Sequence, residues 1–302
     1  MIRLALILVS ALAVGGCGVN IMHGMGNGGG GGAGGGGAGG GGGSAGGGGV
    51  GGGGGGGSGG GDSYTVYAHS NTVLYSLDLA TKSIVTIGPF NAPNKDVIQD
   101  LAVAPDTNVI YVISKTTLYT ADPNDGHVTS IGSVGDCGTD NVALTTTDDG
   151  KLYSADYQKG GFCEIDVSKS PIAVTQIGTL GGNMAIAGDI VGIGDGSIYG
   201  TAYNMNDSSS TGTSINNVLV KIDPATGTMQ TMLGATGFPK LFGVAYAGGM
   251  VFGFTHDGSG DVITIDPKTG VGTLFNTFSD PQSGMPITFS GAGVNSKVSP
   301  IG

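Results

Sequence analysis

One phrase recurs five times along this chain, and its spacing limits the folds that the chain can adopt. Each copy is a short apolar run that ends in an aspartate, followed by a tight turn and a second apolar run. Successive aspartates are 44, 44, 57 and 43 residues apart. A period of roughly 40–50 residues built from short strands is typical of a β-propeller. The five aspartates are Asp78, Asp122, Asp166, Asp223 and Asp266.

The last repeat shows how many strands each copy contains. Its apolar runs cover residues 242–246, 250–254, 262–266 and 272–275, and Gly, Asp and Pro residues fill the gaps between them. Four runs joined by such turn sequences predict a four-stranded antiparallel blade. The fourth repeat is longer because a polar insertion, residues 204–216, separates its second and third runs.

The first repeat lacks a strand that the end of the chain can supply. Only three apolar runs precede the second repeat, while residues 286–292 contain an unmatched run. We predict that residues 287–290 pair beside residues 64–67 as the innermost strand of the first blade, because a closed ring leaves only short, protected edges. The predicted fold is therefore an all-β propeller of five four-stranded blades, with a six-bladed or open arrangement as the alternative.

The amino-terminal segment predicts export. Arg3 precedes an apolar stretch, residues 4–14, that is too short to cross a bilayer, and small residues then lead to Cys17. Val14-Gly-Gly-Cys17 resembles the lipobox of bacterial lipoproteins, in which the cysteine is diacylated and becomes the mature N-terminus. An ordinary signal peptide with a chance cysteine is the alternative.

The lipobox resemblance implies a location and an order of segments. Gly18 follows the cysteine, and by resemblance to the sorting rule of Gram-negative lipoproteins this implies the outer membrane, facing the periplasm or the cell surface. Residues 28–61 are almost pure glycine, which cannot bury a core and is expected to remain a disordered tether. The expected organisation is a signal peptide at 1–16, a lipidated N-terminus and tether at 17–61, and a propeller domain at 62–302.

The charge balance excludes several classes of partner. Arg3 is the one arginine, and the remaining chain holds ten lysines against 22 acidic residues. Nucleic-acid binding and docking on anionic lipid both require cationic groups, so neither is expected. The absence of tryptophan argues against a carbohydrate-stacking site. We expect a monomer held at the membrane by its acyl anchor, with an envelope protein or a small ligand as partner.

Two copies of the repeat resemble a known type. Asp223-Pro-Ala-Thr-Gly and Asp266-Pro-Lys-Thr-Gly, in repeats with an apolar–Gly ending, resemble the YVTN/NHL-type propeller repeats of secreted bacterial proteins. Residues 166–170 fit the pattern poorly. The resemblance covers about residues 64–290 and implies the fold, whereas its motifs recur in unrelated functions and imply no activity.

Two cysteines are expected near one face of one blade. Cys137 lies in the loop that enters the third repeat, and Cys163 begins the third strand of that repeat. In an exported protein this placement predicts a disulfide. A reactive thiol pair is the alternative.

The aspartates fall into two groups. The five recurring ones are interpreted as turn caps, because an Asp side chain accepts hydrogen bonds from backbone N–H groups in the turn that follows it. A second group could ring the mouth of the central channel and bind a ligand or a cation, with solvated loop acids as the alternative. Within it, residues 257–261 resemble part of a calcium loop but lack its glycine and its distal glutamate, so no metal ligand is assigned. This group is Asp96, Asp100, Asp136, Asp140, Asp189, Asp257 and Asp261.

The sequence offers little support for catalysis. It contains no His-x-x-x-His pair and no Gly-x-Ser-x-Gly elbow, and Glu164 is its one glutamate. We assign no catalytic residue and expect no cofactor, with Ca²⁺ at residues 257–261 as the alternative. The leading hypothesis is a binding or scaffolding module at the cell envelope, whose binding face carries Cys137, Cys163 and residues 204–216. The alternative is a metal-dependent propeller hydrolase or lyase with an aspartate-lined channel mouth, and a passive surface-coat element is a third.

Overall fold

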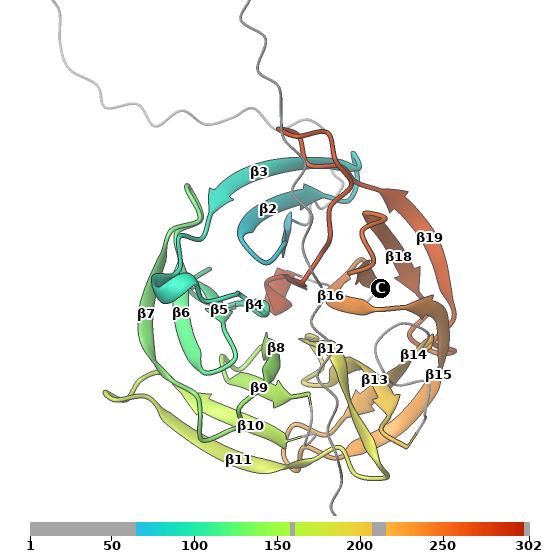
Figure 1. Cartoon of the computed structure of the whole chain (residues 1–302). Helices are drawn as coiled ribbons and strands as arrows, with labels where there is room; N and C mark the ends of the chain where they lie inside the picture. The colour runs from blue at the N-terminus through green and yellow to red at the C-terminus, as the bar shows by residue number, and fades with distance from the viewer. Residues whose placement is uncertain (1–64, 158–160, 207–215, 299–302) are drawn as a thin grey trace, which may run out of the picture. The chain divides into compact units, whose positions relative to one another are not determined.

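Five four-stranded antiparallel sheets surround a common axis and form a β-propeller (Figure 1). The computed structural model describes residues 65–157, 161–206 and 216–298. The predicted fold and blade count are confirmed. Among the described residues no helix is long and apolar enough to cross a membrane. The predicted signal peptide, Cys17 and the glycine tether lie outside the described residues.

Each blade is an antiparallel meander whose first strand lies nearest the axis, and two 3₁₀ turns complete the elements. Blade one is β20 (Gly291–Gly293), β1 (Thr65–His69), β2 (Val73–Asp78) and β3 (Ser83–Pro89). Blade two is β4 (Asp100–Val103), β5 (Ile110–Ile113), β6 (Thr117–Ala121) and β7 (Val128–Ser133). Blade three is β8 (Asn141–Thr146), β9 (Leu152–Asp156), β10 (Gly161–Asp166) and β11 (Ala173–Thr179). Blade four is β12 (Met184–Gly192), β13 (Ile198–Asn204), β14 (Asn216–Ile222) and β15 (Met229–Pro239). Blade five is β16 (Leu241–Ala247), β17 (Met250–Thr255), β18 (Asp261–Ile265) and β19 (Gly272–Thr277), and the 3₁₀ turns are η1 (Pro93–Lys95) and η2 (Ser296–Val298).

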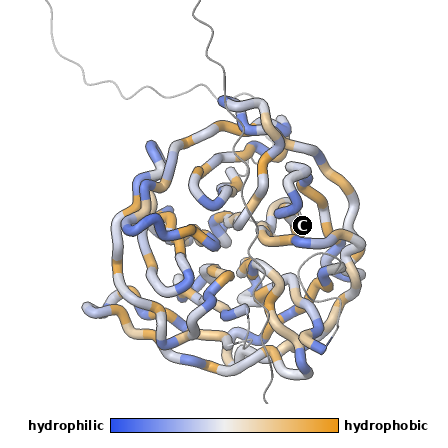
Figure 2. Tube along the Cα trace, in the orientation of Figure 1, coloured by the Kyte–Doolittle hydropathy of each residue, from blue (hydrophilic) through white to orange (hydrophobic). Residues whose placement is uncertain are grey.

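The core lies between neighbouring blades. Apolar and polar residues are interspersed along the strands (Figure 2), and the apolar ones of the three inner strands of each blade are mostly buried, whereas the outer strands are largely accessible. All nine residues of β12 are buried. This pattern follows from the propeller itself, because both faces of each blade are covered by its neighbours.

The five repeated aspartates end the third strand of each blade or follow it directly. In every copy one carboxylate oxygen accepts the N–H of the residue two positions further on, at 2.8–2.9 Å. Hydrogen bonds within the turn also hold the pKa of Asp78, Asp122, Asp166 and Asp266 below its ordinary value. These carboxylates fix the turns between third and fourth strands.

Glycines in the outer strands explain the apolar–Gly ending of the repeat. A Cβ on Gly88 would lie 2.0 Å from the carbonyl oxygen of Asp125, and one on Gly178 would lie 2.0 Å from that of Thr226. Asp125 and Thr226 belong to third-to-fourth-strand turns of the next blade. The turn of one blade therefore packs so closely on the outer strand of the preceding blade that a side chain cannot fit.

The C-terminal strand closes the ring, but the predicted residues are wrong. The innermost strand of blade one is Gly291–Gly293, paired with residues 67–69 of β1, and not residues 287–290 paired with 64–67. The apolar side chains that suggested a strand fill the core instead, where Phe289 packs edge-on against Phe254 with ring centroids 5.3 Å apart. A Cβ on Gly293 would lie 2.7 Å from Leu101 Cδ1, so this crowded position at the axis leaves no room for a side chain.

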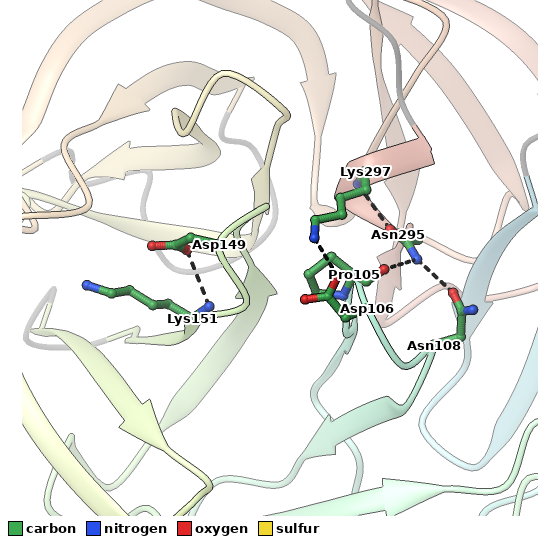
Figure 3. Close-up of polar contacts among 7 residues, drawn as sticks. All are labelled: Pro105, Asp106, Asn108, Asp149, Lys151, Asn295 and Lys297. Atoms are coloured by element: carbon green, nitrogen blue, oxygen red, sulfur yellow. Dashed lines mark hydrogen bonds and ion pairs between the residues drawn. The ribbon is translucent and has the colours of Figure 1, made fainter.

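The chain continues past β20 and attaches to blade two. The side-chain nitrogen of Asn295, Nδ2, donates to the carbonyl oxygen of Pro105 at 3.0 Å and to Asn108 Oδ1 at 2.7 Å (Figure 3). Lys297 forms an ion pair with Asp106. Pro105, Asp106 and Asn108 lie in the turn between β4 and β5. The closing segment is thus bonded to two blades.

Candidate functional site

A cavity of about 270 Å³ lies around the axis on the face formed by the blade-to-blade connections and the second-to-third-strand turns. Every blade contributes to its wall. In an antiparallel meander these two kinds of connection fall on one face, so they converge above the innermost strands. The lining residues are Asn71, Val97, Gln99, Lys115, Asp140, Val142, Tyr157, Ala187, Gly188, Phe242, His256 and Ser290.

Aromatic rings line part of the wall. Phe242 of β16 stacks on His256, which follows β17, with ring centroids 4.4 Å apart and an interplanar angle of 19°. Tyr157, which follows β9, stacks on Tyr203 of β13 at 5.1 Å. Ala187 and Gly188 of β12 lie in the same wall. A Cβ on Gly188 would lie 2.4 Å from Phe242 Cα, so this glycine allows β12 to pack closely on β16.

Polar groups line the rest of the wall. Asn71 Oδ1 accepts a hydrogen bond of 2.5 Å from Ser290 Oγ, and Gln99 Nε2 donates to the carbonyl oxygen of Val97 at 3.3 Å. Lys115 Nζ lies 2.7 Å from Asp140 Oδ1. The ion pair brings one donor and one acceptor of opposite charge to the same side of the cavity.

The ionisable groups of this wall carry no net charge near neutral pH. Burial lowers the pKa of His256 below its ordinary value, against a hydrogen bond from its Nδ1 to the carbonyl oxygen of Phe289 at 2.7 Å. The imidazole is therefore neutral, and the charges of Lys115 and Asp140 cancel. A neutral ligand meets no uncompensated charge here.

Beneath the cavity, two buried carboxyl groups bind the innermost strands together. Asp100 accepts the N–H groups of Leu101 at 2.8 Å and Leu144 at 2.6 Å. Asp189 accepts the N–H groups of Ile190 and Val244, both at 2.5 Å, and of Ala292 at 3.4 Å. These five amides belong to β4, β8, β12, β16 and β20, one from each blade. We call Asp100 and Asp189 the axial pair.

Burial favours the protonated form of the axial pair. Both side chains are fully buried, and desolvation raises the pKa of Asp100 well above its ordinary value and that of Asp189 to about 8. The neighbouring charge of Asp189 and a hydrogen bond between the two side chains raise the pKa of Asp100 further, because two adjacent buried carboxylates cannot both be ionised at low cost. At neutral pH the pair therefore retains at least one proton.

His69 is a third buried titratable group at the axis. Burial lowers its pKa to about 4, and its Nδ1–H donates to the carbonyl oxygen of Ser70 at 2.7 Å. Its Nε2 has no hydrogen-bond partner among the described residues. The ring packs edge-on against Phe90 at a centroid distance of 5.5 Å. Asp100 is also a neighbour, because a Cβ on Gly291 would lie within 2.4 Å of both His69 Nε2 and Asp100 Oδ1.

The structure disperses most of the seven aspartates proposed for the channel mouth. Asp140 lines the cavity, whereas Asp136 is exposed on the loop before β8. Asp96 accepts hydrogen bonds from Ser114 and Tyr119, at 3.1 and 2.6 Å, and Asp257 accepts the N–H and hydroxyl of Ser259. Asp261 accepts the hydroxyl of Thr277 at 2.6 Å.

The prediction that Asp100 and Asp189 belong to mouth loops is wrong. Both lie in the innermost strands β4 and β12, are fully buried, and accept backbone N–H groups. A carboxyl that satisfies strand amides in this way is structural and out of reach of a solvent-borne substrate. Among the described residues no group of three or more His, Cys, Asp or Glu side chains could hold a metal ion.

Cys137 and Cys163 form a disulfide, with Cα atoms 5.8 Å apart. It joins the loop between β7 and β8 to β10, and the same loop carries Asp140 of the cavity wall three residues later. Of the insertion that the sequence also placed on this face, residues 207–215 lie outside the described residues.

Most of the cavity wall was not anticipated from the sequence. Asn71, Gln99 and Ser290 occupy single turn or loop positions, and Phe242 and His256 are 14 residues from each other and 34 or more from the other cavity residues along the chain. A sequence signal does exist for one group. Phe242 begins the first apolar run of the clearest repeat and His256 follows the second, so an antiparallel hairpin of these two runs predicts that they lie together on the mouth face.

Comparison with known proteins identifies no relative by sequence. No family model matches this chain, and no curated protein matches it. Among solved structures 842 chains match. One of them, titled "Crystal structure of Nidogen/Laminin Complex", is 17% identical, covers 77% of this chain and 98% of that chain, and has a TM-score of 0.49. Such a likeness shows neither a family nor a function.

Proposed function

We propose that this chain is an exported, lipid-anchored propeller that binds a ligand or a partner at its axial cavity. The observation that carries the proposal is the cavity itself, a concave site to which all five blades contribute aromatic rings and a few polar groups. Clefts of mixed aromatic and polar lining are the usual form of a binding site. The lipobox-like Cys17 and the glycine tether support an anchored location at the cell envelope.

Because the axial pair is buried, its carboxyl groups cannot reach a ligand in the cavity and are not candidates for catalysis. Its oxygen atoms accept the amides of the innermost strands, so they hold the ring together. The groups that face the cavity are an ion pair, amides, a hydroxyl and a neutral imidazole. Ser290 Oγ lies 3.4 Å from His256 Nδ1, but that nitrogen donates its proton to the carbonyl oxygen of Phe289 and so does not act as a base toward the hydroxyl. The set positions a ligand. A metal-dependent hydrolase or lyase gains no support from the described residues.

The test compares two lysines in matched settings on opposite faces. The Lys115 side chain is 59% exposed and pairs with Asp140 in the cavity wall, whereas that of Lys151 is 50% exposed and pairs with Glu164 at 3.4 Å. Lys151 lies at the end of the turn between β8 and β9, on the face that also carries the Asp106–Lys297 pair (Figure 3). The full chain, immobilised, is exposed to envelope extract, and bound proteins and small molecules are identified by mass spectrometry.

We expect Lys115→Ala to reduce capture and Lys151→Ala to leave it unchanged, with both variants melting at the wild-type temperature. Equal capture by the wild type and both variants would mean that the binding site lies outside the cavity. Capture of nothing by the wild-type chain would oppose a binding role under these conditions and favour a passive coat element.

A further inference from the structure

We propose that the axial cavity recognises a neutral saccharide unit, an inference that rests on the binding function proposed above. The argument begins with the division of the wall. Phe242, His256, Tyr157 and Ala187 make one part apolar or aromatic, and Asn71, Gln99, Ser290 and the Lys115–Asp140 pair make the other part polar. A ligand that fits must therefore be amphipathic within the width of a single ring.

A pyranose ring has this character. Its axial C–H groups form an apolar face that packs on aromatic rings, which are electron-rich on their faces. Its hydroxyl groups both donate and accept hydrogen bonds around the edge. Tryptophan is absent from the chain, but the stacked Phe242–His256 pair supplies an aromatic surface held in place by its own 4.4 Å packing.

The polar part of the wall offers donors and acceptors in alternation. Lys115 donates and Asp140 accepts from positions 2.7 Å apart, a spacing that two adjacent hydroxyl groups of a sugar can span. Asn71 accepts from Ser290 through its oxygen, which leaves its amide nitrogen to donate. Gln99 donates through its nitrogen, which leaves its oxygen to accept.

Size and charge restrict the ligand further. A cavity of about 270 Å³ lies just below the usual range for small-molecule sites, about 300–1,000 Å³, so it suits a single sugar unit and not a long segment of protein. The cation in the wall is already paired, and the whole chain has a net charge of −11. Anionic ligands are therefore disfavoured relative to neutral ones.

The experiment is saturation-transfer NMR on the full chain, with the methyl β-glycosides of glucose, galactose, N-acetylglucosamine and glucuronic acid as probes. We expect saturation of the ring C–H protons for at least one neutral glycoside. The glucuronide has the same ring as the glucoside with an added carboxylate, and it is expected to bind more weakly than the glucoside if the glucoside is the ligand.

Two matched pairs of variants locate the binding. Phe242→Ala is compared with Phe275→Ala, a half-buried phenylalanine of β19 that lines a hollow on the other face. Asn71→Ala is compared with Asn124→Ala, an exposed turn residue on that same other face. We expect the cavity variants to bind about tenfold more weakly, which corresponds to ~1.4 kcal/mol, and the controls to bind as wild type. If Phe242→Ala does not fold, the comparison of Asn71→Ala with Asn124→Ala tests the binding site instead.

Each other outcome overturns the inference. Saturation of no glycoside would exclude a saccharide unit of these types, and Lys115-dependent capture of an envelope protein would then leave the binding function standing with a protein loop as its ligand. Equal loss in the cavity and control variants would mean that any sugar contact is non-specific. Tighter binding of the glucuronide than of every neutral glycoside would replace the neutral ligand with an anionic one.

Discussion

At the scale of single residues, Gly291 has the least room of any position in the closing strand. A Cβ at this position would lie 2.3 Å from His69 Nε2 and 2.4 Å from Asp100 Oδ1. We predict that Gly291→Ala reduces the free energy of unfolding by about 1–3 kcal/mol, because the axial side chains must shift to admit the methyl group. Urea denaturation followed by circular dichroism measures this change.

Gly135→Ala is the control for that substitution. Its added Cβ would meet only Ser133 Oγ, at 3.4 Å, on an exposed loop. The control is expected to remain within about 0.5 kcal/mol of wild type. If both variants had the same stability, the axis would be less tightly packed than the distances indicate.

The axial pair predicts a stability that falls with rising pH. The pKa of each carboxyl is higher in the folded protein than its ordinary value of 3.8, and that of Asp189 is about 8. The folded state therefore holds protons that the unfolded state has released, and the stability that they provide is full below pH 3.8 and is lost as the pH rises to about 8. His69 acts in the opposite direction below pH 6.5, because its pKa is lowered on folding.

The informative window is thus pH 6.5 to 8. Within it we expect the free energy of unfolding, from urea titrations, to decrease by about 1.4 kcal/mol per pH unit for each proton retained. Asp100→Asn should flatten this slope by removing one titrating group, and should lower stability at every pH because an amide nitrogen cannot accept a strand N–H. A wild-type stability that is level or rises across the window would contradict a protonated pair.

At the scale of strands and loops, turn sequences explain why so much of the fold could be predicted. Asp-Pro steps begin the third-to-fourth-strand turns of blades two, four and five, and Thr-Gly steps end those of blades four and five. Between the turns lie short strands, most of four to seven residues. The closing strand was misplaced for a physical reason. Its neighbours at the axis exclude side chains, so the strand is Gly-Ala-Gly, and the apolar run before it belongs to the core.

The axial pair could not be distinguished from loop acids by pattern alone. Asp100 and Asp189 each precede a short apolar run, as do many aspartates in turns. What separates them is the convergence of five strand amides on the axis, which depends on ring closure by residues far apart in the chain. The cavity wall was missed for the same reason, since each blade contributes only a few side chains to it.

The segment after β20 should contribute measurably to ring closure. Asn295 is nearly buried and donates two hydrogen bonds to the β4–β5 turn of blade two. We predict that Asn295→Ala destabilises the domain by about 1–3 kcal/mol, because it leaves a buried carbonyl and an amide without their donor. Asn124→Ala, in an exposed turn, is expected to have little effect, and equal urea midpoints for the two variants would argue against this role.

The disulfide should stabilise the loop that carries Asp140. It closes a segment of 26 residues between Cys137 and Cys163, for which the chain-entropy model gives about 3–4 kcal/mol. We predict that the double change Cys137→Ala and Cys163→Ala lowers the urea midpoint accordingly and weakens ligand capture at the cavity. Unchanged stability after reduction of the wild-type protein would contradict this prediction.

At the scale of the whole molecule, retention at a membrane is predicted to depend on acylation of the Cys17 thiol. The chain has a net charge of −11, so attraction to anionic lipid would not hold it at a membrane. The described residues contain no helix long and apolar enough to cross a membrane. Acyl chains on Cys17 would contribute about 0.8 kcal/mol per buried CH₂, and several chains together hold a protein stably. We predict that Cys17→Ser moves the protein from the membrane pellet to the soluble fraction and abolishes incorporation of labelled palmitate.

The matched control replaces the other two cysteines. The Cys137→Ala, Cys163→Ala protein keeps Cys17 and should remain in the pellet after a carbonate wash, even though its propeller is less stable. Retention of the Cys17→Ser protein would instead assign anchoring to the uncleaved apolar segment at residues 4–14. Because the long glycine segment joins Cys17 to the propeller, the soluble variant is expected to keep the wild-type melting temperature and cavity binding, which separates the anchor from the binding site.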